Sequence, residues 1–180
     1  MGIWLGSEKP NAEGDVVLQQ QPGKDVNFVE LGALAARTCG IKPVDHDPVV
    51  ALPNMPDWAK GTIAALQDAG VSTFLDPRTN ANGTATRADA FEIMVEVCGD
   101  QLPPAPADPT AVLDNFKDFN AGTVSSDVAQ ATAILVDGEI IRGKSDGTEL
   151  ALDEPLKKSE VVQMSFQILE ATEDKELFQE

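Results

Sequence analysis

Histidine, cysteine and basic residues are scarce in this 180-residue chain, and each scarcity excludes a class of function. The one histidine, His46, stands in a proline-rich stretch between two aspartates, which predicts a surface residue and no catalytic histidine. The two cysteines, Cys39 and Cys98, are too few for a disulfide framework. We expect each to be a small buried apolar residue and not to pair with the other. Motifs for nucleophilic catalysis or phosphate binding are also absent, so we expect no enzyme activity and no cofactor.

Thirteen lysines and arginines oppose thirty aspartates and glutamates, which leaves a formal net charge of −17. Binding to nucleic acid requires clustered basic side chains that neutralise phosphates, and binding to an anionic membrane surface has the same requirement. No stretch reaches the roughly 18 consecutive apolar residues that a membrane-spanning helix needs. The sequence therefore predicts no nucleic-acid partner and no insertion into a membrane.

The segment 57–99 carries the clearest pattern, with an amphipathic helix expected on each side of a polar loop. In the first helix, Ala59, Ile63 and Leu66 recur at helical spacing along one face. Gly70 follows at the position just past the last turn, where glycine adopts a left-handed backbone at little cost. The loop at 76–83 has the composition of a calcium loop but not the EF-hand spacing, so we expect a turn and no metal site.

The second helix of this segment begins with a capping pattern. The Thr86 hydroxyl can accept from the third helical amide, and Asp89 can reach back to the amide of the capping residue. Arg87 lies between them and is not needed for capping, so we expect it to be free for another role. One face of this helix then carries Phe91, Val95 and Cys98.

The same pattern recurs in two weaker copies. Aligning Glu160 with Asp89 brings Val162, Phe166 and Leu169 to the positions of Phe91, Val95 and Cys98. The turn Gly138–Gly143 matches the turn at Gly70, and Asn27 matches Thr86 near the N-terminus. We therefore predict a mainly α fold in which the units share one core, formed by Ile63, Phe91, Val95, Val162 and Phe166.

These elements together resemble the S-layer homology (SLH) module. They are Asp57-Trp58 opening a helix, the Gly70-Val71 turn, and Thr86-Arg87-Ala88-Asp89 opening a second helix. The resemblance implies helix–loop–helix repeats in a pseudo-threefold bundle, because one helix pair cannot bury its apolar face alone. The resulting division is an incomplete unit at 1–42, a proline-rich linker at 43–56, a unit at 57–100, a second such linker at 101–113, a unit at 114–171 and an acidic tail at 172–180. We expect the proline-rich stretches at 42–56 and 101–109 to be extended and not helical.

The first unit lacks its first helix, because the chain begins at Gly2–Gly6, which resembles the turn of that unit. Either the chain is a fragment cut inside a repeat, or the tail at 172–180 or a partner chain supplies the missing element. Without such cover, Leu31, Leu34 and Ala35 would lie in water, forgoing about 25 cal/mol for each Å² left unburied. We therefore expect the tail or a partner to cover them.

The SLH resemblance also implies a ligand, a pyruvylated secondary cell-wall polysaccharide held in grooves between units. Carried over by position, the binding residues are Asp57, Trp58, Gly70 and Arg87, with Lys158 standing in the third unit where the family has arginine. An aromatic face suits a sugar ring, and a guanidinium pairs with a carboxylate through two hydrogen bonds.

The expected function is a non-catalytic anchoring module that binds cell-envelope polysaccharide at the cell surface. The alternative is a structural subunit of a surface layer, appendage or virion that uses the fold to contact other protein subunits. An exposed Trp58 beside Arg87 would favour sugar binding, whereas burial of both would favour assembly. Met1–Gly6 has no features of a secretory signal, so we expect a fragment, a processed form or a virion component.

Overall fold

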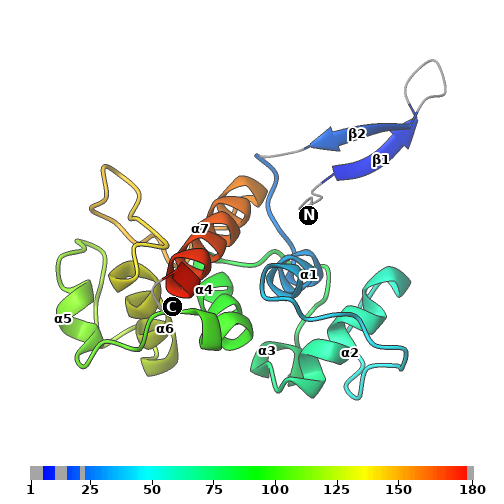
Figure 1. Cartoon of the computed structure of the whole chain (residues 1–180), viewed down its shortest axis with the longest axis horizontal. Helices are drawn as coiled ribbons and strands as arrows, with labels where there is room; N and C mark the ends of the chain where they lie inside the picture. The colour runs from blue at the N-terminus through cyan, green and yellow to red at the C-terminus, as the bar shows by residue number, and fades with distance from the viewer. Residues whose placement is uncertain (1–5, 11–15, 21–22, 178–180) are drawn as a thin grey trace.

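A computed structural model describes residues 6–10, 16–20 and 23–177 of the chain, with the side chains of residues 23–171. Helices dominate these residues, which confirms the predicted mainly α class (Figure 1). They are α1 (Phe28–Thr38), α2 (Lys60–Asp68), α3 (Ser72–Leu75), α4 (Arg87–Cys98), α5 (Pro109–Leu113), α6 (Ser126–Asp137) and α7 (Lys158–Leu177). Two short 3-10 turns, η1 (Asp57–Ala59) and η2 (Gly99–Gln101), precede α2 and follow α4.

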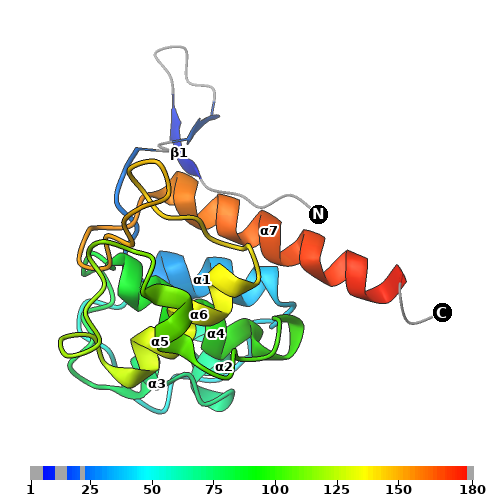
Figure 2. The same cartoon turned by 90° about the vertical axis from the view of Figure 1, so that its left-hand side faces the viewer.

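The N-terminal region forms an antiparallel hairpin that the repeat pattern does not predict. Strand β1 (Gly6–Pro10) pairs with β2 (Val16–Gln20), and the hairpin stands away from the helices in both views (Figures 1 and 2). Of the expected turn Gly2–Gly6, residues 2–5 lie outside the described part of the chain, and Gly6 begins β1.

Capping residues set the starts of α1 and α4. Asn27 and Glu30 form a complete capping box at α1, and Thr86 and Asp89 form one at α4, as predicted for the latter. Lys157 precedes α7, and its backbone amide donates to the Glu160 carboxylate over 2.9 Å. Glu160 therefore takes the place at α7 that Asp89 takes at α4.

The segments that lead into α1, α4 and α7 are joined in a closed ring of backbone hydrogen bonds. The amide of Val26 donates to the carbonyl of Leu156 (2.9 Å), Leu156 donates to Ala85 (3.0 Å), and Ala85 donates back to Val26 (3.0 Å). Each of these residues lies two positions before the first residue of its helix. The three segments are thus equivalent in hydrogen bonding, and we call α1, α4 and α7 the ring helices.

Two further helices each cover one ring helix. Helix α2 packs on α1, and α6 packs on α4, so we call α2 and α6 the covering helices. The packing is close at Gly32, where an added Cβ would come within 3.0 Å of Leu66 on α2 and within 2.6 Å of the Phe74 ring on α3. Helix α1 also contacts α4 and α7, which completes its burial.

The expectation that α1 needs cover from the tail or a partner is wrong. Leu31, Leu34 and Ala35 are buried, because α2, α4 and α7 together surround α1. Residues 172–177 continue α7 as a helix and do not turn back onto α1 (Figure 2). The absence of a first helix from the first unit therefore does not leave α1 exposed.

The predicted shared core includes Ile63, Phe91 and Val95, but Val162 and Phe166 are not part of it. Ile63 and Phe91 are fully buried, Val95 packs against the core, and Val162 is half-buried. Phe166 is 55% exposed, so its prediction as a core residue is wrong. Helix α7 buries a different face, formed by Val161, Met164, Ser165 and Ile168. The reason is that no covering helix lies on the Phe166 side of α7 within the described residues.

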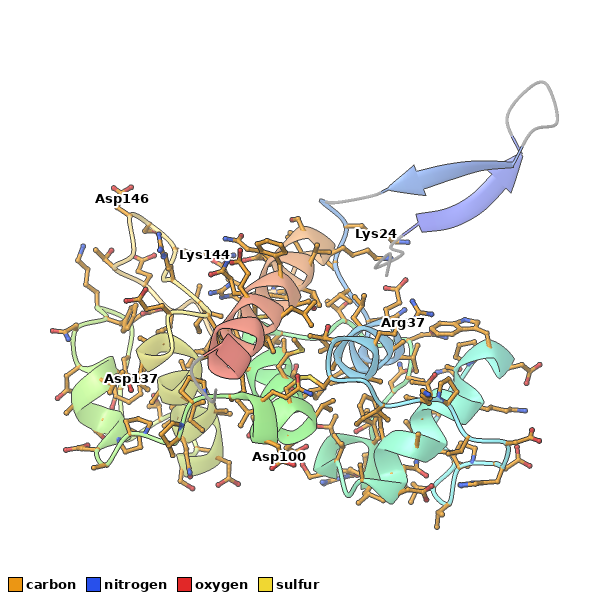
Figure 3. The ribbon with its side chains drawn as sticks, in the orientation of Figure 1. Lys24, Arg37, Asp100, Asp137, Lys144 and Asp146 are labelled. Carbon is orange, nitrogen blue, oxygen red and sulfur yellow. A yellow bond between two sulfur atoms is a disulfide. The ribbon has the colours of Figure 1, made fainter. Side chains whose placement is uncertain are left out.

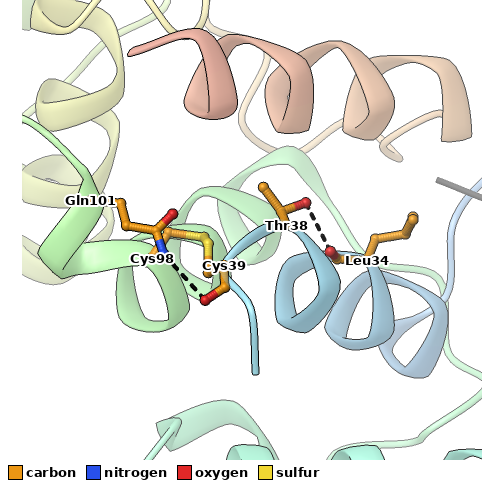
Figure 4. Close-up of a disulfide and its surroundings, with 5 residues drawn as sticks. All are labelled: Leu34, Thr38, Cys39, Cys98 and Gln101. Atoms are coloured by element: carbon orange, nitrogen blue, oxygen red, sulfur yellow. Dashed lines mark hydrogen bonds between the residues drawn. A yellow bond between two sulfur atoms is a disulfide. The ribbon is translucent and has the colours of Figure 1, made fainter. Parts of the chain in front are cut away.

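Cys39 and Cys98 form a disulfide, which corrects the expectation of two separate apolar cysteines (Figure 4). Each cysteine lies at the C-terminal end of a ring helix, and α1 packs against α4, so their Cα atoms are 5.4 Å apart. This distance is within the usual range for a disulfide. The Gln101 side chain donates to the Cys39 carbonyl over 3.2 Å beside the bond.

The linkers differ from each other in structure. Residues 43–56 are not helical, as expected, and they lie along α2, where the buried Gln67 amide bonds both backbone groups of Val50 (2.8 and 3.1 Å). In the 101–113 linker, residues 102–108 are not helical, as expected for its proline-rich part, and α5 begins at Pro109, the last residue of that part. Asp108 caps this helix and proline occupies its first position, where a missing amide hydrogen has no cost.

Candidate functional site

A groove of about 390 Å³ lies where the start of α4, the loop after α6 and one side of α7 come together. Arg87 contributes from α4, and the loop contributes residues 139–144. Helix α7 contributes Glu160, Gln163, Met164 and Gln167. Figure 3 shows Lys144 on this loop, close to the first turns of α7. We call this site the Arg87 groove.

The loop 139–144 is held firmly by the end of α6 and by packing beneath it. The amides of Ile140 and Ile141 both donate to the Leu135 carbonyl, over 2.9 and 3.1 Å, and both side chains are buried. Gly143 lies against Phe116, where an added Cβ would come within 2.8 Å of the ring. The backbone of the loop is therefore fixed, and its polar side chains are presented to the groove.

Arg87 is buried and fully engaged at the base of the groove. Its Nε donates to the Leu150 carbonyl (2.8 Å), its Nη1 donates to Glu160 (2.6 Å), and its guanidinium lies 5.1 Å from the centre of the Phe91 ring. Burial lowers the pKa of Arg87, and the carboxylates of Glu160 and Glu154 oppose that shift. The expectation that Arg87 is free is wrong, because the first residue of α4 lies against α7 and not at the surface.

Two cations on the loop complete the groove. Lys144 lies 2.6 Å from Glu154 and 3.7 Å from Glu160, and its ammonium lowers the pKa of Glu154. Arg142 is exposed, and no carboxylate of the described residues lies within ion-pair distance of it. Three cations and two carboxylates, Glu139 and Glu160, thus line the groove in a chain of net charge −17. Such a site can hold a ligand carboxylate, with Arg142 as the available donor.

Of the five expected binding residues, only Arg87 lines the groove, and Asp57, Trp58, Gly70 and Lys158 do not. Asp57 pairs with Lys60 over 2.7 Å, and hydrogen bonding to Lys60 lowers the pKa of Asp57. Trp58 is 59% exposed on η1, and Gly70 follows α2 with a φ of +81°. None of Asp57, Trp58 and Gly70 lines the groove that contains Arg87. Trp58 is therefore exposed without lying beside Arg87, which matches neither arrangement expected from the sequence.

Lys158, the fifth expected residue, forms a contact equivalent to that of Arg87. Its Nζ lies 2.6 Å from Glu30, so the first residue of α7 pairs with the third residue of α1. Arg87, the first residue of α4, pairs with Glu160, the third residue of α7, in the same way. Phe28 occupies the remaining first position and forms no ion pair. Both basic residues therefore link one ring helix to the next.

Arg142 and Lys144 are the basic groove residues that the expected set omits. Both flank the end of the Gly138–Gly143 turn, which the repeat alignment matches with the turn at Gly70. Their positions next to a repeated turn were a usable signal. The missing information was spatial, because the turn of the third unit lies opposite the arginine of the second unit and not opposite its own Lys158.

The remaining candidate sites have simpler roles. Arg78 binds Asp76 through its Nε and Nη2, at distances from 2.7 to 3.1 Å, and these bonds lower the pKa of Asp76 to about 2. His46 lies 2.9 Å from Asp68, and hydrogen bonds to the Asp47 backbone and to Asp68 raise its pKa. Among the described residues, no group of three histidine, cysteine or acidic side chains could hold a metal ion. In that same part of the chain, no helix is long and apolar enough to cross a bilayer.

No protein-family model matches this sequence, and no curated protein matches it. The arguments about function therefore rest on the groove, on the arrangement of the helices and on the residues that resemble the SLH module.

Proposed function

We propose that the protein is a non-catalytic anchoring module that binds an acidic cell-envelope polysaccharide in the Arg87 groove. The observation that carries this proposal is the grouping of Arg87, Arg142 and Lys144 around one groove in a chain of net charge −17. Lys144 is paired with Glu154 and Arg87 with Glu160, so the local attraction for a negatively charged ligand comes mainly from Arg142.

The dimensions and donors of the groove suit a sugar that carries a carboxylate. Its volume of about 390 Å³ falls within the range of small-molecule sites. Arg142 forms no ion pair with the described residues, so its guanidinium can bind a carboxylate through two parallel hydrogen bonds. Gln163 and Gln167 on α7 add amide groups that can bond sugar hydroxyls. Arg87 and Glu160 hold the floor of the site in place.

The resemblance to the SLH module supports the same ligand class. In that family, the polysaccharide lies in a groove between units, beside the arginine of the second helix and the backbone of a glycine turn. Here Arg87 belongs to the second unit and the turn Gly138–Gly143 belongs to the third. The proposed site therefore lies between units, and Arg142 and Lys144 replace Asp57 and Gly70 as its principal residues. Trp58 remains a proposed separate contact for a sugar ring because it is exposed.

The disulfide supports a location at the cell surface. The Cys39–Cys98 bond joins two ring helices. Disulfides of this kind persist mainly in oxidising compartments, such as the exterior of the cell.

The test is co-sedimentation of the purified protein with cell-wall sacculi, before and after their polysaccharide is removed. We expect retention that depends on the polysaccharide and that falls at least about tenfold in Arg142→Gln, because a bidentate contact to a carboxylate is lost. Arg78→Gln is the matched control, since it removes the same charge from an exposed site away from the groove. Equal retention of the parent and Arg142→Gln, or retention that survives removal of the polysaccharide, would contradict the proposal.

A further inference from the structure

Helix α7 exposes an apolar face that the rest of the described chain leaves uncovered. Phe166 is 55% exposed and Leu169 is 37% exposed, and Val162 lies beside them, half-buried. These three residues fall at i, i+4 and i+7, so they form one stripe along the helix. We call this stripe the open face of α7.

The equivalent stripes on the other two ring helices are covered. Counting from the third residue of each helix, the same positions on α1 are Gly32, Ala36 and Cys39, and on α4 they are Phe91, Val95 and Cys98. Each of these six residues is buried or half-buried. The open face of α7 therefore occupies the same helical positions as the stripes on α1 and α4, but it differs from them in what packs against it.

The covering helices account for this difference. Helix α2 lies on α1, where Gly32 faces Leu66 and Phe74, and α6 lies on α4. The two covering helices end alike, since the Val71 amide donates to the Leu66 carbonyl (3.0 Å) and the Ile140 amide donates to the Leu135 carbonyl (2.9 Å). No helix of the described residues takes the corresponding place on α7.

We propose that the open face of α7 binds an amphipathic helix of a partner protein, in the place that α2 takes on α1 and α6 takes on α4. Among the described residues no comparable helix is left to occupy that place, because α2 and α6 are both already packed on ring helices. A second copy is disfavoured because each copy carries a net charge of −17.

The covering helices and the local charge define the chemistry of the partner. The partner helix carries small and branched apolar residues on one face, as α6 does with Ala131, Ile134 and Leu135. Its polar face is basic, because acidic residues follow the open face along the sequence at Glu170, Glu173, Asp174 and Glu176. This inference concerns a surface apart from the Arg87 groove and does not depend on the proposed polysaccharide ligand.

The experiment uses a fluorescent peptide with the sequence of residues 125–141, changed at two positions by Asp127→Lys and Asp137→Lys, to represent a basic covering helix. Fluorescence anisotropy measures its binding to the full-length protein. We expect saturable binding that weakens at least about tenfold in Phe166→Glu, because a charge replaces the central apolar contact. Leu169→Glu provides a second variant on the same face. The matched control is Val49→Glu, which changes another exposed apolar side chain (79% exposed) and should bind as the parent does.

Circular dichroism and thermal unfolding verify that both α7 variants stay folded, which is expected because both side chains are exposed. Absence of saturable binding to the parent, or equal binding by the parent and both folded α7 variants, would overturn the proposal. Sedimentation velocity tests whether a second copy of the protein covers the open face instead. A dimer of the parent that Phe166→Glu abolishes would show that a second copy covers the face, which would also overturn it.

Discussion

Arg87 and Arg78 each form an ion pair, but only the arginine of the first pair is buried. Arg87 has a side chain only 6% exposed and links α4 to Glu160 on α7, whereas Arg78 is 89% exposed and binds Asp76 two residues away. Removing one partner of a buried pair leaves the other charge without its compensation, while an exposed charge is solvated by water.

Arg87→Ala should therefore lower the free energy of unfolding by about 3 kcal/mol, as for other broken buried pairs. Arg78→Ala should lower it by less than about 1 kcal/mol. Urea unfolding monitored by circular dichroism measures both changes. If the two variants lose the same amount of stability, Arg87 does not hold α4 against α7 as described.

Glu92 provides a pH-dependent test at the residue scale. Burial, followed by repulsion from Glu96, Asp89 and Asp127, raises the pKa of Glu92 in the folded state. The folded protein then holds this proton more tightly than the unfolded chain does. The contribution of Glu92 to stability therefore falls as pH rises from the unfolded pKa through the raised folded pKa, and it stays low at neutral pH.

Glu92→Gln should accordingly raise the midpoint of thermal unfolding at pH 7, by about 1–3 °C because Glu92 is partly solvated. The difference from the parent should vanish near pH 3, where Glu92 is protonated in both states. Calorimetry at both pH values measures the effect. A difference of the same size at pH 3 and pH 7 would mean that the carboxylate charge is not its cause.

At the scale of the helices, burial depends on which partner lies against each ring helix. Phe91 on α4 is fully buried in the common core, whereas Phe166 on α7 is 55% exposed. Phe91→Ala should lower the free energy of unfolding by roughly 3–5 kcal/mol, as for a buried aromatic side chain. Phe166→Ala should change it by less than about 1 kcal/mol in the isolated protein. Chemical denaturation of the two variants provides the comparison, and a large loss in Phe166→Ala would mean that something already covers α7.

At the scale of the whole molecule, one covalent bond joins α1 to α4, and α7 is held by non-covalent contacts. The Cys39–Cys98 bond closes a loop with a sequence separation of 59 residues. In the chain-entropy account, a loop of this length stabilises the folded state by about 4 kcal/mol. Reduction with dithiothreitol should therefore lower the denaturant midpoint of the parent. The Cys39→Ala, Cys98→Ala double variant should unfold at the midpoint of the reduced parent and should not respond to dithiothreitol.

The Arg87 groove and the open face of α7 are consequences of one arrangement. Two ring helices, α4 and α7, form an ion pair to a neighbour through their first residue, and among the described residues α1 and α4 carry a covering helix. The groove forms where Arg87 of α4 meets the turn that follows a covering helix, α6. The open face lies on the ring helix that has no covering helix. Both proposed sites thus use α7, the groove through Gln163 and Gln167 and the open face through Val162 and Phe166.

Local sequence determined the elements whose signals lie within a few residues. The Thr86–Asp89 capping box, the helix through Ile63 that ends before Gly70, and the equivalence of Asp89 with Glu160 all follow from spacing along the chain. Capping and helical periodicity depend on residues three or four positions apart, so they can be read without knowing the fold. The mainly α class follows from the same local patterns.

Only the tertiary structure decided which elements face one another. The disulfide, the burial of Arg87 and the exposure of Phe166 depend on contacts between segments that are far apart in the sequence. The repeat pattern predicted a missing helix, but the contacts show that covering helices lie on the ring helix of the preceding unit. The bare surface is therefore on α7 and not on α1, because periodicity specifies the apolar face of a helix but does not specify its partner.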